Sequence, residues 1–308
     1  MFFRTDLALE LKEGGQSELL DVPCKIKEKD RCKISHITVP CHIKDTGMAP
    51  GEYITIEMPP LSDALDENNR FLQVVSDEIK PFLPENGEVL VAGLGNAAIT
   101  PDALGEKVIA QILATRHVKK ELERITGISE LRSVAAVSTD VLGNTGMETA
   151  EILKGLTQQL RPKAVIVIDA MAARSLERLG KTVQISTAGI APGAGVGNRR
   201  PQIDQALLGV PVISVGVPTV VDAATVAVDL LGEEHVTDEE KEKLREMVSP
   251  NGAAMFVTPR EIDLLIQRGA RMIGMAINAA LNPCFTVNDF NKIKASTETA
   301  VFYSIILI

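Results

Sequence analysis

A short apolar run that ends in two closely spaced glycines is the feature that most constrains the fold of this chain. The run covers residues 89–92 (Val-Leu-Val-Ala) and is followed by Gly93 and Gly95. Its length and its bounding glycines are typical of a fully buried strand rather than of a helix. Because glycine permits backbone conformations that other residues avoid, Gly93 and Gly95 allow a tight turn above the end of the strand.

The turn leads into a helix start that carries a carboxylate. Thr100 is placed to cap the helix, Pro101 takes the first helical position, and Asp102 follows in the first turn. Open α/β sheets place their active sites just outside the carboxyl ends of such strands, so Asp102 is a candidate catalytic residue. The alternative is a plain crossover in which Asp102 only complements the helix dipole.

A dinucleotide site is the other familiar use of a glycine-rich turn between a strand and a helix. Here Ala98 stands where the third glycine of the GxGxxG pattern belongs, and no acidic residue ends a second strand at the expected distance. We therefore set a dinucleotide site aside.

From residue 88 onward, strand and helix patterns alternate along the chain. This alternation predicts an α/β fold with a mostly parallel sheet and helices on both faces. Residues 7–290 are expected to form one domain, in which about 7–60 are a smaller β-containing appendage. Strands are predicted at 31–40, 53–58, 88–92, 133–138, 164–169, 182–186 and 211–215, and helices at 61–82, 101–113, 147–160, 222–248 and 260–281.

A second carboxylate follows the most strand-like run of the chain. Asp169 comes directly after Val-Ile-Val-Ile, where an unpaired charge would be costly to bury. Parallel strands joined by crossovers lie near one another, so we expect Asp102 and Asp169 to face one crevice. Two carboxylates in one such site have pKa values that are pushed apart, so one can hold a proton while the other activates water. This arrangement suits hydrolysis of an amide bond.

Nucleophilic triads are not indicated by the sequence. Ser186 lacks the GxSxG turn, and none of the four histidines follows a predicted strand. Asp140, in the loop after the strand at 133–138, is the reserve candidate for an acidic catalytic residue.

A glycine-rich loop at residues 189–200 follows another strand. Gly193, Gly195 and Gly197 can direct several main-chain N–H groups toward one anion, and Arg199 and Arg200 add positive charge. The alternative is a flexible connection with exposed arginines.

Composition limits the partners that the chain can have. The net charge is −9, the pI is near 5.1 and there is no Trp, so nucleic acid is not expected as a direct partner. No apolar run is long enough to span a bilayer and no targeting segment is evident, so we expect a cytoplasmic protein without a membrane partner.

The cysteines indicate neither disulfides nor a metal site. Cys24, Cys32, Cys41 and His42 match no CxxC spacing, and four cysteines form no disulfide framework in a chain of 308 residues. Reduced thiols, no metal and no cofactor are expected.

Several long segments resemble the germination protease (spore protease) family of endospore-forming bacteria. The resemblance implies an atypical aspartic endopeptidase that degrades small acid-soluble spore proteins in the spore core, is made as a zymogen and assembles as a homotetramer. The two essential aspartates of the family fall on Asp102 and Asp169. The matching segments are Arg4-Thr-Asp-Leu-Ala-Leu-Glu10, Gly93-Leu-Gly-Asn96 with Thr100-Pro-Asp-Ala-Leu-Gly105, Gly143-Asn-Thr-Gly-Met-Glu-Thr149, Ile168-Asp-Ala-Met-Ala-Ala-Arg-Ser175 and residues 189–200.

The resemblance also implies a role for the N-terminal segment. Thr5-Asp6-Leu7-Ala8-x-Glu10 is similar to the Thr-Glu-Ile-Ala-x-Glu site that is cut in the spore proteins. The implied processing point lies between Asp6 and Leu7, which makes residues 1–6 a propeptide. Our hypothesis is that an arginine holds the acidic residue before the cut. The residues expected to bind substrate are Arg174, Gly193, Gly195, Gly197, Asn198, Arg199 and Arg200.

Two other functions stay open at this point. The strand, glycine turn and acidic helix also resemble hydrogenase maturation endopeptidases, whose fold is phosphorylase-like and whose site binds metal, although residues 186–200 offer no His as a third ligand. A non-enzymatic α/β module that binds an anion is the second alternative. Asp140 and the tail at 291–308 depart from the spore-protease pattern.

Overall fold

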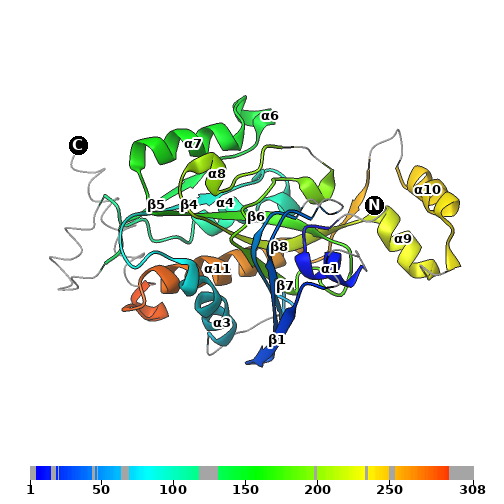
Figure 1. Ribbon diagram of the computed structural model, residues 1–308, viewed down its shortest axis with the longest axis horizontal. Coiled ribbons are helices and arrows are strands. Elements are labelled where there is room, and N and C mark those ends of the chain that lie inside the picture. Colours follow the sequence, from blue (N-terminus) through cyan, green and yellow to red (C-terminus); the bar gives the residue numbers. More distant parts are fainter. Residues whose placement is uncertain are drawn as a thin grey trace.

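One mixed sheet runs through the molecule. The structure is a computed structural model that describes residues 5–14, 19, 21–43, 46, 48–63, 69–117, 131–197, 200–232, 235–249 and 254–290. In these ranges the strands have the order β1-β2-β3-β7-β8-β6-β4-β5, and β9 pairs with β8 (Figure 1). Their bounds are β1 Cys24–Lys29, β2 Cys32–Val39, β3 Gly51–Glu57, β4 Val89–Gly93, β5 Val134–Ser138, β6 Ala164–Ala173, β7 Thr182–Ser186, β8 Val212–Asp222 and β9 Phe256–Val257.

The central strands β8, β6, β4 and β5 are parallel, as the sequence predicts. The predicted strand β7 is present but runs antiparallel to both of its neighbours, β3 and β8. Through the pairing of β3 with β7, the N-terminal strands β1–β3 extend the main sheet, with Ile54 opposite Ile185. The β-containing N-terminal segment therefore shares one sheet with the parallel core.

Helices cover both faces of the parallel region, because successive residues of a buried strand point to opposite sides. Val89 and Val91 of β4 pack with α3, α4 and α11, whereas Leu90 and Ala92 pack with α7 and α8 (Figure 1). The helices are α1 Ala8–Glu13, α3 Arg70–Ile79, α4 Leu104–Ile109, α6 Leu142–Thr145, α7 Thr149–Leu160, α8 Gln205–Leu208, α9 Ala223–Leu231, α10 Asp238–Met247 and α11 Ile262–Leu281, and the 3-10 turns are η1 Lys80–Phe82, η2 Thr100–Asp102 and η3 Ala194–Val196.

Some predicted helices differ in extent from those of the structure. The helices expected at 147–160 and 260–281 are confirmed as α7 and α11. The one expected at 222–248 is two helices, α9 and α10, and the one expected at 61–82 begins only at Arg70, with 64–68 outside the described residues. The tail at 291–308 also lies outside them.

The start of the helix after β4 was predicted wrongly. Thr100 does not cap α4; it opens the 3-10 turn η2, with Ile99 at the preceding position, and α4 begins at Leu104. The ring of Pro101 suits the start of either helix type, so local sequence does not decide between them.

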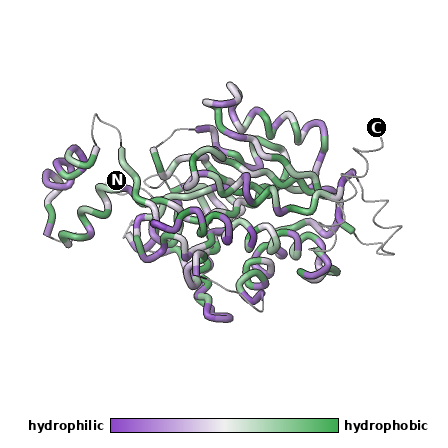
Figure 2. Tube along the Cα trace, turned by 180° about the vertical axis from the view of Figure 1, so that it is seen from behind, coloured by the Kyte–Doolittle hydropathy of each residue, from purple (hydrophilic) through white to green (hydrophobic). Residues whose placement is uncertain are grey.

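The pair α9 and α10 projects from one end of the sheet (Figure 1). Hydrophilic residues dominate α10, whereas hydrophobic residues dominate the central strands (Figure 2). Over the described ranges, no helix has both the length and the apolar character needed to cross a membrane.

Candidate active site

A cavity of about 600 Å³ opens above the carboxyl ends of β4 and β6. Its wall contains both predicted catalytic residues, Asp102 and Asp169, together with the reserve candidate Asp140. Asp6 from the N-terminal segment lies in the same wall. With Glu148, which also lines the cavity, five acidic residues from distant segments of the chain share one partly apolar space.

The position of Asp169 follows from strand register. Ile168 of β6 lies opposite Gly93, the last residue of β4, so Asp169 is the first residue beyond the end of the neighbouring strand. The sequence predicted that β6 ends at this point, but it continues to Ala173 beside β8. Asp169 is only 5% exposed and accepts a hydrogen bond of 2.9 Å from the N–H of Ala170. Burial, with the charges of Asp102 and Asp6 added, raises the pKa of Asp169 well above its ordinary value.

The turn after β4 fixes Asp102. Gly95 has a φ of +98°, and a Cβ at this position would overlap the main-chain carbonyl of Asp102. The turn can therefore close over η2 only with glycine at 95. The Asp102 Oδ2 accepts a hydrogen bond of 2.8 Å from the N–H of Asn96. Burial raises the pKa of Asp102, and the nearby charge of Asp140 raises it further.

Asp140 is held in place by its own loop. It has a φ of +57°, and its Oδ1 accepts hydrogen bonds from the N–H of Val141 at 2.8 Å and from Asn144 Nδ2 at 2.9 Å. These bonds fix the Asp140 carboxylate within the loop that leads from β5 to α6.

The N-terminal segment lies against β6 like an added strand. The N–H of Asp6 donates to the carbonyl of Ala172 at 2.9 Å, and the N–H of Ala172 donates back to Asp6 Oδ2 at 2.8 Å. The N–H of Gly195 also donates to the Asp6 carboxylate. Burial raises the pKa of Asp6 to about 6, because these N–H donors offset only part of the cost of removing the charge from water. Sequence pattern alone gives no sign that Asp6 reaches this cavity.

The residues that follow Asp6 are also enclosed. Leu7 is fully buried in a cluster with Met171, Ala173, Leu179 and Val221, and its N–H donates to Thr5 Oγ1 at 3.0 Å. The N–H of Ala8 donates to Gln184 Oε1 at 2.7 Å, and Gln184 Nε2 donates to the carbonyl of Asp6 at 2.7 Å. The sequence did not point to Gln184 as a site residue. Its one available signal is that a polar glutamine stands within the predicted buried strand 182–186.

Glu10 completes the set of enclosed motif residues. It is 3% exposed, and its carboxylate accepts hydrogen bonds from the N–H groups of Arg174 at 2.7 Å and Ser175 at 3.0 Å. Thr5 Oγ1 donates to the same carboxylate. Arg178 lies 3.7 Å from Glu10 and pairs with Glu13 at 2.6 Å, which fixes α1 beside the end of β6.

The glycine-rich loop contributes main-chain groups to the site. A Cβ at Gly195 would overlap the Asp6 carboxylate, so glycine allows the loop to approach this closely. Gly193 lines the cavity, and Gly197 ends η3 with a φ of +83°. Asn198 and Arg199 lie outside the described residues.

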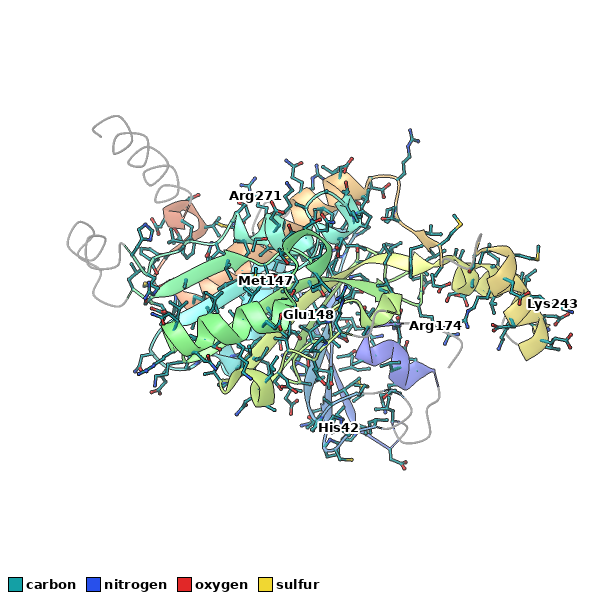
Figure 3. The ribbon with its side chains drawn as sticks, turned by 90° about the horizontal axis from the view of Figure 1, so that it is seen from above. His42, Met147, Glu148, Arg174, Lys243 and Arg271 are labelled. Carbon is teal, nitrogen blue, oxygen red and sulfur yellow. The ribbon has the colours of Figure 1, made fainter. Side chains whose placement is uncertain are left out.

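Of the three arginines that we expected to hold Asp6, the structure describes Arg174 and Arg200, and Arg199 lies outside the described residues. Arg200 lines the cavity but pairs with Glu148 at 2.8 Å, next to the start of α7. Arg174 lines a second cavity with Glu10 and Glu13, and Figure 3 shows it beside α1, away from Glu148. The Asp6 carboxylate accepts from the main-chain N–H groups of Ala172 and Gly195, which the extended β6 and the glycine-rich loop bring beside it.

A family comparison agrees with the segments that form this site. The family model described as germination protease matches residues 5–234, which carry Asp6, Asp102, Asp140 and Asp169. The chain belongs to the germination protease family. Membership of this family makes it a protease of spore germination.

Curated relatives match almost the whole chain. The germination protease of Caldanaerobacter subterraneus subsp. tengcongensis is 44% identical over 94% of this chain and 97% of the relative. That of Clostridium tetani is 38% identical over 95% and 99%, and that of Priestia megaterium is 34% identical over 91% and 93%.

One similar solved structure is the [NiFe] hydrogenase maturation protease HycI from Thermococcus kodakarensis. It is 13% identical, covers 67% of this chain and 99% of its own, and has a TM-score of 0.35, too low to support an inference about function. Within the described residues, no group of three His, Cys, Asp or Glu side chains is arranged to hold a metal ion.

Proposed function

We propose that this protease hydrolyses the peptide bond after an acidic residue by direct attack of water, with Asp102 and Asp169 as the catalytic pair. The observation that carries this proposal is the position of Asp6, whose carboxyl group lies in the cavity that both aspartates line. Residues 5–10 then represent a substrate bound to its own enzyme. The corresponding substrates are the small acid-soluble spore proteins, whose cleavage site this segment resembles.

The different environments of the two aspartates give them different roles. Asp169 is the more deeply buried and its pKa is raised further, so we assign it the role of the residue that keeps a proton and Asp102 the role of the one that ionises. Asp102 takes a proton from water as the water oxygen bonds to the carbonyl carbon of Asp6. The carbon–nitrogen bond then breaks, and the proton of Asp169 passes to the nitrogen of Leu7.

Recognition of the substrate depends on two buried carboxylates in the segment that residues 5–10 represent. The acidic residue before the cut is held by the N–H groups of Ala172 and Gly195. The glutamate four residues after the cut is held by the N–H groups of Arg174 and Ser175. A substrate that lacks either carboxylate leaves buried donors unpaired, which costs about 1–3 kcal/mol for each group.

Autoprocessing and assembly belong to the same proposal. Cleavage between Asp6 and Leu7 removes residues 1–6 and converts the zymogen to the active enzyme in the cytoplasm of the spore core.

Exposed apolar side chains support assembly into a homotetramer through α9 and α10: Leu230 is 80% exposed and Met247 is 79% exposed. Analytical sedimentation of the wild-type protein and of the Leu230→Lys variant tests this assembly. The charged lysine should weaken the apolar interface, so the variant should sediment as smaller species than the wild-type protein.

The test uses the full chain and a peptide of its residues 1–14. Mass spectrometry should show cleavage between Asp6 and Leu7, and the rate should be the same with and without a chelator. Cleavage that stops when chelator is added favours a metal-dependent peptidase. Tight phosphate binding without any cleavage favours the anion-binding module and rejects the proposal.

A further inference from the structure

The side chain of Gln184 spans the peptide bond between Asp6 and Leu7. Its Nε2 donates to the carbonyl oxygen of Asp6 at 2.7 Å, and its Oε1 accepts from the N–H of Ala8 at 2.7 Å. Both contacts join β7 to a segment about 180 positions away in sequence. The Gln184 amide thus contacts the carbonyl group of the bond between Asp6 and Leu7, and also the N–H of Ala8, the residue that follows Leu7.

The partners of Gln184 determine how its amide is oriented. A main-chain N–H can only donate and a main-chain carbonyl can only accept, so the Gln184 nitrogen must face Asp6 and its oxygen must face Ala8. The side chain is 3% exposed on β7, which pairs with β3 on one side and β8 on the other. A buried amide with both ends occupied, on a strand in the interior of the sheet, is held in one orientation before any reaction begins.

We propose that Gln184 is a catalytic residue that stabilises the oxyanion formed when the bond between Asp6 and Leu7 is hydrolysed. This inference rests on the proposed function, because it takes that bond as the one that is cut. By the same geometry, Gln184 contacts the corresponding carbonyl of a spore-protein substrate bound in place of residues 5–10.

The reaction places charge on the oxygen that Gln184 contacts. Water adds its oxygen to the carbonyl carbon of Asp6, one water proton goes to Asp102, and the carbon–oxygen double bond becomes a single bond to a negatively charged oxygen. The Gln184 N–H strengthens its hydrogen bond as that charge develops. When the oxygen re-forms its double bond, the bond to the Leu7 nitrogen breaks and this nitrogen takes the proton of Asp169. A donor that is fixed in place before the reaction stabilises the charged state more than the ground state.

The first experiment compares self-processing rates of the full-length protein. Gln184→Leu keeps a side chain of similar size without the donor, and loss of one oxyanion donor is expected to slow cleavage by roughly 10²–10³-fold. Thr182→Val is the matched control, since Thr182 lies two residues away on the same face of β7 and its buried hydroxyl has no hydrogen-bond partner among the described residues. The rate of Thr182→Val should equal that of the wild-type protein, and melting temperatures show whether each variant is folded.

The second experiment separates a catalytic from a structural role. Gln184→Glu keeps the acceptor for Ala8, and its second oxygen can donate to the Asp6 carbonyl only when it is protonated. The rate of Gln184→Glu divided by that of the wild-type protein should therefore rise at least tenfold as the pH is lowered from 7 to 5. Taking the ratio removes the part of the pH dependence that both proteins share through Asp6, Asp102 and Asp169, which face the same site.

The outcomes distinguish the inference from the proposed function. If the wild-type protein is not cut between Asp6 and Leu7, the proposed function fails and the inference fails with it. If the wild-type protein is cut there, but Gln184→Leu is cut at the same rate or the Gln184→Glu ratio does not change with pH, the inference alone is wrong. If Gln184→Leu does not fold, the Gln184→Glu ratio decides.

Discussion

Asp6 and Ala172 form a reciprocal pair in which the N–H of each residue donates to an oxygen of the other, at 2.9 Å and 2.8 Å. One of these acceptors is the side-chain carboxylate of Asp6 and not its carbonyl. Asp6 therefore binds beside β6, three residues beyond Asp169, with its carbonyl turned to Gln184. This pairing connects the N-terminal motif to the two candidate catalytic aspartates.

Replacing either catalytic aspartate with Asn should abolish cleavage. Asp102→Asn removes the acceptor for the water proton and Asp169→Asn removes the donor to the leaving nitrogen, so each should lower the rate at least about 10³-fold. Intact mass against time measures processing of the full chain. Asp77→Asn, on α3 outside the cavity, is the control and should process at the wild-type rate. Normal turnover in either site variant contradicts the mechanism.

Docking of the N-terminal segment should become stronger as the pH falls. The pKa of Asp6 is about 6 when docked, against a usual value of 3.8, so the docked state binds a proton more tightly than the free segment. Docking therefore gains stability as the pH falls from above 6 toward 4 and loses it as the pH rises through 6. Asp6→Asn should remove this dependence, because it has no charge to bury.

Hydrogen exchange at the Ala172 amide measures that docking, since this N–H is covered by Asp6. The measurement uses the Asp102→Asn background to prevent cleavage, with rates corrected for the intrinsic effect of pH on exchange. If the Ala172 amide of the Asp102→Asn protein, which retains Asp6, is equally protected from exchange at pH 5 and pH 7, the prediction is wrong.

A methyl group at position 195 should interfere with binding of the acidic residue. Gly195→Ala places a Cβ against the Asp6 carboxylate, and overpacking of this kind costs about 1–3 kcal/mol, or roughly 5–150-fold in cleavage rate. A peptide with Gly in place of Asp6 should be affected much less. Gly155→Ala is the control, because a Cβ there meets open space. Equal losses with both peptides argue against a main-chain pocket for the acidic residue.

Glu10 should contribute more to stability than its neighbour Glu13. Glu10→Ala leaves the buried N–H groups of Arg174 and Ser175 without their acceptor, at a cost of about 1–3 kcal/mol in the free energy of unfolding. Glu13→Ala removes a half-exposed partner of Arg178, worth about 1 kcal/mol or less. Urea unfolding of both variants measures the difference. The prediction does not hold if Glu13→Ala is the more destabilising.

Local sequence was sufficient for the elements of the central sheet. The apolar run at 89–92, the glycines after it and the acids at 102 and 169 mark a strand end, a turn and two charges, and each depends on neighbours within a few residues. The antiparallel direction of β7 and the continuation of β6 to Ala173 were not predictable in this way. Both are settled by pairing with strands that are distant along the chain.

The sequence by itself therefore determined where the central apolar strands run, where the chain turns after β4, and that one acid follows this turn and another follows the apolar run of β6. Only the tertiary structure decided that Asp6, Gln184 and Glu10 join them, and that the N–H groups of Ala172 and Gly195 bind the Asp6 carboxylate. The physical reason is that these contacts join positions 164 to 178 residues apart, where no periodicity or spacing rule applies. They form because the sheet brings β6 and β7 beside a segment that has its own hydrogen-bonding groups to satisfy.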